Sequence, residues 1–88
     1  MAFLKRTSND IVQVIPLPDG KTTIGRSRQC DLNLRSPVVS KIHAVIECRS
    51  GSCTLKNESS KGTIVNENKV QGMRQLVPGD QIRIGWER

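Results

Sequence analysis

The sequence predicts an all-β sandwich. Turn-forming residues interrupt the chain every six to twelve positions, which is the cadence of short strands. β-branched residues fill the intervals, and no window places apolar residues at the spacing of an amphipathic helix. A chain of 88 residues supports one hydrophobic core, so we expect residues 1–88 to form a single domain.

The expected strands come in six runs. In chain order they cover residues 11–15, 22–24, 44–48, 54–55, 63–65 and 81–84. The first, second and fifth runs consist mainly of Ile, Val and Thr, which fit a pleated surface. Every second residue is apolar in the third run (Ala44, Ile46, Cys48) and in the sixth (Ile82, Ile84), so these strands are expected to bury one face. Turn formers separate the runs, at residues 8–10, 18–20, 36–37, 50–51, 59–62, 67–68 and 78–80.

The net charge of +6 indicates an acidic partner, either nucleic acid, an anionic membrane surface or a phosphorylated peptide. The basic residues are scattered, and Phe3 and Trp86 are the only aromatic residues, so the stacking platforms of single-strand binding proteins are missing. Direct nucleic-acid binding is therefore not favoured. No apolar run approaches the roughly 18 residues of a membrane span, and no secretory signal is visible. We expect a soluble intracellular protein with no membrane partner.

The three cysteines are Cys30, Cys48 and Cys53, an odd number for a disulfide scaffold, so reduced thiols are expected. With His43 they could supply four zinc ligands, but their spacing matches no zinc pattern, and no metal is expected. Cys48 and Cys53 flank a short turn, and we expect their thiols to pack against each other across a hairpin.

Five short fragments lie in a fixed order at predicted loops or strand edges. They are Gly25-Arg26, Asp31-Leu32, the run 39–44, the run 60–66 and the turn 78–80. Together they resemble the forkhead-associated (FHA) domain family, over roughly three quarters of the chain. The resemblance implies a sandwich of two mainly antiparallel sheets, which binds phosphothreonine peptides through loops at one end. Family members usually carry a further strand after the Ile-Gly segment, so we expect a truncated last strand and the N-terminal module of a longer protein.

The resemblance also implies which residues contact the ligand. A phosphothreonine carries about −1.5 to −2 charges and three acceptor oxygens, so its reader needs a guanidinium, hydroxyls and backbone N–H groups. By position in the family motifs, the expected contacts are Arg26, Ser40, Lys41, Ser60 and Lys61. The expected supports of these loops are Gly25, His43, Gly62 and Thr63.

Lys61 departs from the family pattern, because an asparagine normally precedes the glycine of this loop. Lysine has donors only, whereas the asparagine amide both donates to and accepts from the peptide main chain. We therefore expect binding that depends more on charge and less on main-chain pairing. Asp31 is expected to anchor backbone N–H groups in its loop.

An alternative is a structural domain that dimerises through an open sheet edge and has a degenerate phosphate site. An enzyme is not expected, because the sequence has no Walker-type loop and His43 has no nucleophile that can be placed beside it. No cofactor is expected either. By resemblance, the domain would serve a nuclear signalling scaffold, as in the DNA-damage response, with a phosphothreonine protein or a second copy as partner.

Overall fold

The computed structural model describes residues 2–8, 11–35 and 37–84. Within these ranges it contains ten strands and no helix, which confirms the all-β prediction. The strands are β1 Ala2–Ser8, β2 Ile11–Leu17, β3 Gly20–Gly25, β4 Leu32–Asn33, β5 Ala44–Arg49, β6 Ser52–Asn57, β7 Ile64–Val65, β8 Asn68–Lys69, β9 Met73–Leu76 and β10 Ile82–Arg83. In this part of the chain, no helix is long and apolar enough to span a membrane.

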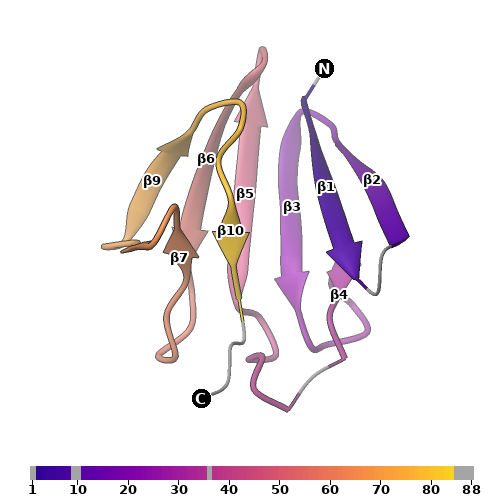
Figure 1. Cartoon of the computed structure of the whole chain (residues 1–88), viewed down its shortest axis with the longest axis vertical. Coiled ribbons are helices and arrows are strands. Elements are labelled where there is room, and N and C mark those ends of the chain that lie inside the picture. The colour runs from indigo at the N-terminus through magenta and orange to yellow at the C-terminus, as the bar shows by residue number, and fades with distance from the viewer. Residues whose placement is uncertain (1, 9–10, 36, 85–88) are drawn as a thin grey trace.

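The strands form two layers plus a hairpin. The main sheet has the order β4-β3-β5-β6-β9, and a smaller sheet has the order β10-β7-β8. Figure 1 shows β7 and β10 in front of the main sheet, with β1 and β2 at the right of the view, beside β3 and β4. All strand pairs are antiparallel except β3 and β4, where Ile24 faces Leu32 and Gly25 faces Asn33. The expected sandwich of mainly antiparallel sheets is therefore confirmed.

The core lies between the layers. Ile24 on β3, Ile46 on β5, Leu55 on β6 and Val65 on β7 are at most 1% exposed. Side chains alternate between buried and half-exposed along the first five residues of β5, as the sequence pattern predicted. Each fully buried aliphatic side chain contributes about 1.5–3 kcal/mol relative to its exposed state. These side chains hold together the strands from which the loops at each end emerge.

Each of the six predicted runs overlaps an observed strand, but β1, β4, β8 and β9 were not predicted. The two-residue strands β4 and β8 are too short to show a periodicity. In β9, only long unbranched side chains and Leu76 are present, and its strand conformation comes from pairing with β6, where Cys53 faces Leu76. The turn predicted at 67–68 begins one residue earlier, because Asn66 and Glu67 have φ values of 51° and 71° and form a two-residue hairpin turn.

Asp80 holds the turn that precedes β10. Its carboxylate accepts the backbone N–H of Val77 at 2.9 Å and the Nδ2 group of Asn66 at 2.7 Å. The Val77 hydrogen bond and then the Asn66 one lower the pKa of Asp80 below its ordinary value of 3.8. Because the lowered pKa favours the carboxylate in the folded chain, this stabilisation is present at neutral pH. It is lost as the pH falls through the folded-state pKa.

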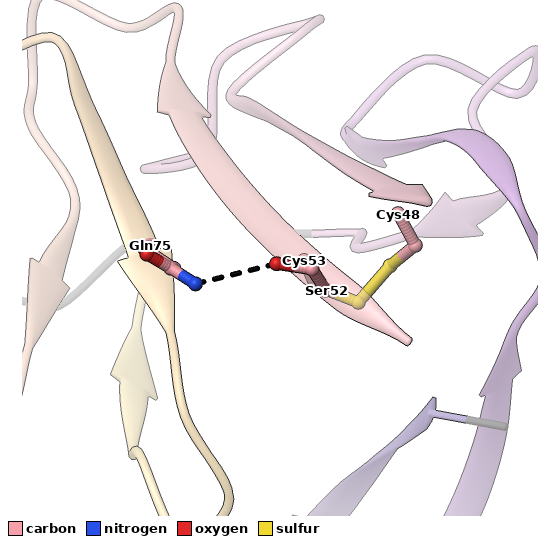
Figure 2. The surroundings of a disulfide bond; sticks show 4 residues. All are labelled: Cys48, Ser52, Cys53 and Gln75. Carbon is pink, nitrogen blue, oxygen red and sulfur yellow. Dashed lines mark hydrogen bonds between the residues drawn. A yellow bond between two sulfur atoms is a disulfide. The ribbon is translucent and has the colours of Figure 1, made fainter. Parts of the chain in front are cut away.

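The expectation of three reduced thiols was wrong for two of them. Cys48 and Cys53 face each other across the β5–β6 hairpin, as expected, but they form a disulfide, with their Cα atoms 4.1 Å apart. Figure 2 shows the bond near the tip of the hairpin, where Gln75 Nε2 also donates to Ser52 Oγ at 3.2 Å. Directly opposed cross-strand positions bring the two sulfurs within bonding reach. Cys30 is a free, buried cysteine, as predicted.

Removing this disulfide should lower stability. The bond closes a short loop, with a sequence separation of five, so the chain-entropy model gives a loss of about 2 kcal/mol in the free energy of unfolding. Urea unfolding of the oxidised protein should therefore show a higher midpoint than unfolding of the Cys48→Ser/Cys53→Ser variant. A Cys30→Ser variant is the matched control for loss of a thiol without loss of the bond. Equal midpoints for the oxidised protein and the double variant would contradict the expectation.

Candidate functional site

Three loops meet at one end of the sandwich. They are the β3–β4 loop (residues 26–31), the β4–β5 loop (residues 34–43) and the β6–β7 loop (residues 58–63). In Figure 1 they lie at the lower end, opposite the β5–β6 turn. All five predicted contact residues lie on these loops, namely Arg26, Ser40, Lys41, Ser60 and Lys61. The structure thus brings the candidate residues to one end, although they come from distant parts of the sequence.

Backbone hydrogen bonds fasten the first two loops together. The N–H of Arg26 donates to Ser40 O at 2.9 Å, and that of Ser27 donates to Lys41 O at 3.1 Å. Gly25 makes this approach possible, because a Cβ built on it would lie 2.2 Å from Lys41 O. Any larger residue would force the β4–β5 loop away. Gly25 is thus required for the close approach of the two loops, and we still predict that it supports ligand binding.

Arg26 is exposed at the start of the β3–β4 loop. Its Nε donates to Val39 O at 3.0 Å, which fixes the plane of the guanidinium. The terminal nitrogens carry four further N–H donors, and no hydrogen bond from them is present among the described residues. Two parallel donors in a fixed plane match two oxygens of a phosphate group. Arg26 is therefore oriented for a bidentate anion contact.

Ser59, which the sequence analysis did not single out, connects Ser40 to the β6–β7 loop. Its Oγ lies 2.6 Å from Ser40 Oγ and accepts the backbone N–H of Lys61 at 3.0 Å. Ser59 is only 6% exposed, so its hydroxyl proton needs an acceptor, and Ser40 Oγ is the acceptor that remains. Either hydroxyl can donate across this contact, and the burial of Ser59 favours Ser59 as the donor. With Ser59 as donor, the proton of the half-buried Ser40 hydroxyl is left for a ligand.

His43 also joins the β4–β5 loop to the β6–β7 loop. It is fully buried, its Nδ1 accepts the N–H of Ser40 at 3.1 Å, and its Nε2 lies 2.7 Å from Gly62 O. Since Nδ1 accepts a hydrogen bond, the ring proton is on Nε2, which donates a hydrogen bond to the Gly62 carbonyl. Both ring nitrogens are therefore used in structural hydrogen bonds. His43 and Gly62 thus connect the two loops, and their support of ligand binding remains a prediction.

Thr63 and Asn57 set the shape of the β6–β7 loop. Thr63 is fully buried, and its Oγ1 donates to Asn57 Oδ1 at 2.8 Å. Asn57 Nδ2 donates to Ser59 O at 2.9 Å, and Gly62 N donates to the same carbonyl at 3.2 Å. These bonds turn Ser59 inward and leave Ser60 exposed on the outer side of the turn. Thr63 thus takes part in the hydrogen bonds of this loop, while its role in supporting a bound ligand stays a prediction.

The β3–β4 loop has two further anchors. Asp31 accepts the N–H of Thr23 at 2.9 Å and its Oγ1 at 3.1 Å, which matches the expected role in anchoring backbone N–H groups. Asn33 was not predicted, and its Nδ2 donates to the carbonyls of Arg26 and Ser27 at 2.9 and 3.0 Å. These bonds hold the backbone on both sides of the arginine. Rigid support of this kind reduces the entropy lost when a ligand is bound.

Zinc binding is not supported by this geometry. Two of the four candidate ligands, Cys48 and Cys53, are consumed by the disulfide. The third cysteine, Cys30, points its sulfur at Lys41 O, 3.3 Å away. Over residues 2–8, 11–35 and 37–84, no three His, Cys, Asp or Glu side chains are grouped so that they could hold a metal ion.

Comparison with known proteins agrees with the fold. The FHA domain model matches residues 22–85. The mouse proliferation marker protein Ki-67 is 37% identical over 85 residues, which are 96% of this chain and 3% of that protein. The chain therefore spans a small fraction of the length of this relative.

Two solved structures share the fold and hold ligands. Mycobacterium tuberculosis EmbR, in complex with a low-affinity phosphopeptide, is 30% identical with a TM-score of 0.81, covering 93% of this chain and 21% of that one. The FHA domain of MEK1, in complex with a HOP1 phosphothreonine peptide, is 26% identical with a TM-score of 0.76, covering 82% and 80%. From its sequence motifs, its strand order and the match over residues 22–85, this chain belongs to the FHA domain family.

Proposed function

We propose that this domain binds phosphothreonine-containing segments of partner proteins and works as an interaction module in signalling, not as an enzyme. The observation that carries the proposal is the pairing of an oriented guanidinium with an oriented hydroxyl. Arg26 Nε is bonded to Val39 O, directly before Ser40, and a hydrogen bond donated by Ser59 to Ser40 would leave the Ser40 proton for a ligand. The phosphopeptide complexes of EmbR and of the MEK1 FHA domain support this ligand class.

Binding would follow from the chemistry of the three loops. The Arg26 fork would donate to two phosphate oxygens, and the Ser40 hydroxyl would donate to one of them. The exposed Ser60 hydroxyl and the ammonium groups of Lys41 and Lys61 are available from the neighbouring loops. Hydrogen bonds to charged groups contribute about 1.5–3 kcal/mol each, so two or three of them give a useful affinity.

Lys61 favours charge over main-chain pairing as the basis of recognition. At this sequence position the family has the amide of an asparagine. The Lys61 ammonium donates instead to Pro37 O at 3.2 Å. Because ammonium attraction is screened by salt, affinity should fall clearly with ionic strength. No observation on the described residues favours the alternative of a dimerisation domain with a degenerate site.

We also propose a cellular setting for this domain. The domain would be one module of a longer protein, which the great length of the Ki-67 relative supports. A nuclear location, a role in the DNA-damage response and pairing with a second copy are further proposals for that longer protein. Imaging of the tagged full-length protein before and after DNA damage tests the location and the response, and analytical ultracentrifugation tests the dimer.

The experiment that tests the function is a titration against a degenerate phosphothreonine peptide library and its unphosphorylated twin. We expect binding to the phosphorylated library only, and its loss after phosphatase treatment of the peptides. Equal binding of the two libraries would point to general attraction of acidic peptides. Binding of neither would remove the proposal.

Replacing Ser59 with alanine should weaken phosphopeptide binding by about fivefold, which corresponds to one neutral hydrogen bond of roughly 1 kcal/mol. The substitution removes the donor to Ser40 and the acceptor for Lys61 N–H. Isothermal titration calorimetry well below the melting temperature would measure the effect. The control is Ser52→Ala, which removes a hydroxyl bonded to Gln75 at the other end of the sandwich. An unchanged affinity of Ser59→Ala would refute the assigned hydroxyl arrangement.

A further inference from the structure

The end of the sandwich that carries the three loops has more positive charge than one phosphate can neutralise. Its loops hold five cationic side chains, Arg26, Arg28, Arg35, Lys41 and Lys61, against the two carboxylates of Asp31 and Glu58, a surplus of three charges. Both carboxylates are engaged elsewhere, since Asp31 binds Thr23 and Glu58 lies 3.5 Å from Lys56 Nζ. A phosphothreonine brings about −1.5 to −2 charges. After it binds, cationic side chains remain without a counter-charge.

Two of these cations, from the neighbouring loops, contact the β4–β5 loop at different backbone carbonyls. The guanidinium of Arg26 reaches it from the β3–β4 loop and donates to Val39 O, directly before Ser40. The ammonium of Lys61 reaches it from the β6–β7 loop and donates to Pro37 O, two residues earlier. The first cation is next to the oriented hydroxyl, whereas the second sits over the preceding part of the loop.

Lys61 keeps donors for a ligand. An ammonium has three N–H donors, and the carbonyl of Pro37 accepts one of them. Lys61 is exposed, so the other two face water and can be taken over by an anionic group at little desolvation cost. The backbone N–H of Lys61 donates to Ser59 Oγ, which also lies 2.6 Å from Ser40 Oγ, and its ammonium is held at Pro37 O, in the same loop as Ser40.

We propose that the ligand carries a second anionic group close to the phosphothreonine, and that Lys61 selects for it. This rests on the proposed phosphothreonine binding and adds the class of substrate, a segment with an acidic residue or a second phosphate beside the first. A carboxylate and a phosphate share the chemistry that Lys61 recognises, a compact anion that accepts two N–H donors. The phosphate, with its higher charge, is the stronger ligand of the two.

The test uses three families of peptides that share one phosphothreonine. One family has neutral flanks, one carries Asp or Glu scanned through the flanking positions, and one carries phosphoserine at the same positions. For the wild-type domain, fluorescence polarisation should show about fivefold tighter binding when an anion occupies the preferred position, and more for phosphoserine. In K61N, which restores the amide of the family, the ratio of anion-flanked to neutral-flanked affinity should fall close to one.

The matched control is K21N, which removes one positive charge from the far end of β3. Lys21 and Gly25 are four residues apart on this strand, about 13 Å, which exceeds the Debye length of about 8 Å at physiological salt. K21N should therefore keep the wild-type ratio. The inference is overturned if the wild type binds both kinds of flank equally, if K61N keeps the preference, or if K21N loses it to the same extent. Failure of all phosphothreonine peptides to bind would instead overturn the proposed function, and the inference with it.

Discussion

Replacing Arg26 with alanine is expected to weaken phosphothreonine-peptide binding by about 100-fold, the largest effect of any single side chain in the site. The expectation follows from the loss of two charge-assisted hydrogen bonds, at about 1.5 kcal/mol or more each. Stability should hardly change, because the side chain is exposed and its hydrogen bond to Val39 O is a single one. Isothermal titration calorimetry and a urea unfolding curve on the same preparation would measure both quantities.

Two further variants separate geometry from charge. Arg26→Lys keeps the charge but has neither the planar fork nor the Nε that bonds Val39 O, so we expect affinity between those of the wild type and the alanine variant. Arg49→Ala removes a cation near the β5–β6 turn, where its guanidinium pairs with Glu47 at 3.4 Å, and should leave affinity unchanged. If Arg49→Ala weakened binding as much as Arg26→Ala, net charge would explain the interaction better than a fixed site.

Gly25→Ala is expected to have the second large effect, and it should reduce both stability and binding. The added Cβ would lie 2.2 Å from Lys41 O and 2.8 Å from Lys41 C, which are backbone atoms that cannot rotate away. Overpacking of this kind costs about 1–3 kcal/mol. The bonds from Arg26 N and Ser27 N to the β4–β5 loop would stretch, and Ser40 would move relative to Arg26. We expect a loss of about 2 kcal/mol in stability and of at least tenfold in affinity.

Gly51→Ala is the control for this variant. Gly51 has a φ of +82° in the β5–β6 turn and nothing within 4 Å of a built Cβ, so alanine there is strained without a clash. We expect it to lose about 1 kcal/mol of stability and to bind normally. Thermal melts and peptide titrations of both variants distinguish a local effect on the loops from a general loss of stability. Normal binding by Gly25→Ala would show that the two loops can separate without loss of the site.

The fold class could be predicted from the sequence. So could the positions of the strand ends from which the three loops of the site emerge. β-branched runs and the alternation along β5 predicted the buried face correctly. The fragments around Gly25, Ser40 and Gly62 pointed to loops that the structure brings to one end. The roles of the five contact residues in binding remain predictions, because the structure shows only that these residues lie on adjacent loops.

Other features depend on contacts that no local pattern reports. Ser59 and Ser60 are adjacent serines that the sequence does not distinguish. The Ser59 hydroxyl turns inward through its bonds to Ser40 Oγ and Lys61 N, while Asn57 Nδ2 and Gly62 N bind the Ser59 carbonyl. The disulfide required the exact register that pairs Cys48 with Cys53. The odd number of cysteines argued against disulfide bonds. The number alone could not show that two cysteines face each other in one hairpin while the third lies elsewhere.

The way in which the loops are joined has a consequence for folding. The bonds from Ser40 to Ser59 and from His43 to Gly62 each connect residues 19 positions apart, whereas the β5–β6 hairpin closes over a two-residue turn. Closing a longer segment costs more chain entropy, and contacts between distant residues form more slowly. We therefore expect the hairpin to be an early local structure and the ligand-binding end to be completed late. A fragment that ended before the β6–β7 loop would contain the hairpin but would lack Ser59, which bonds Ser40, and Gly62, which bonds His43.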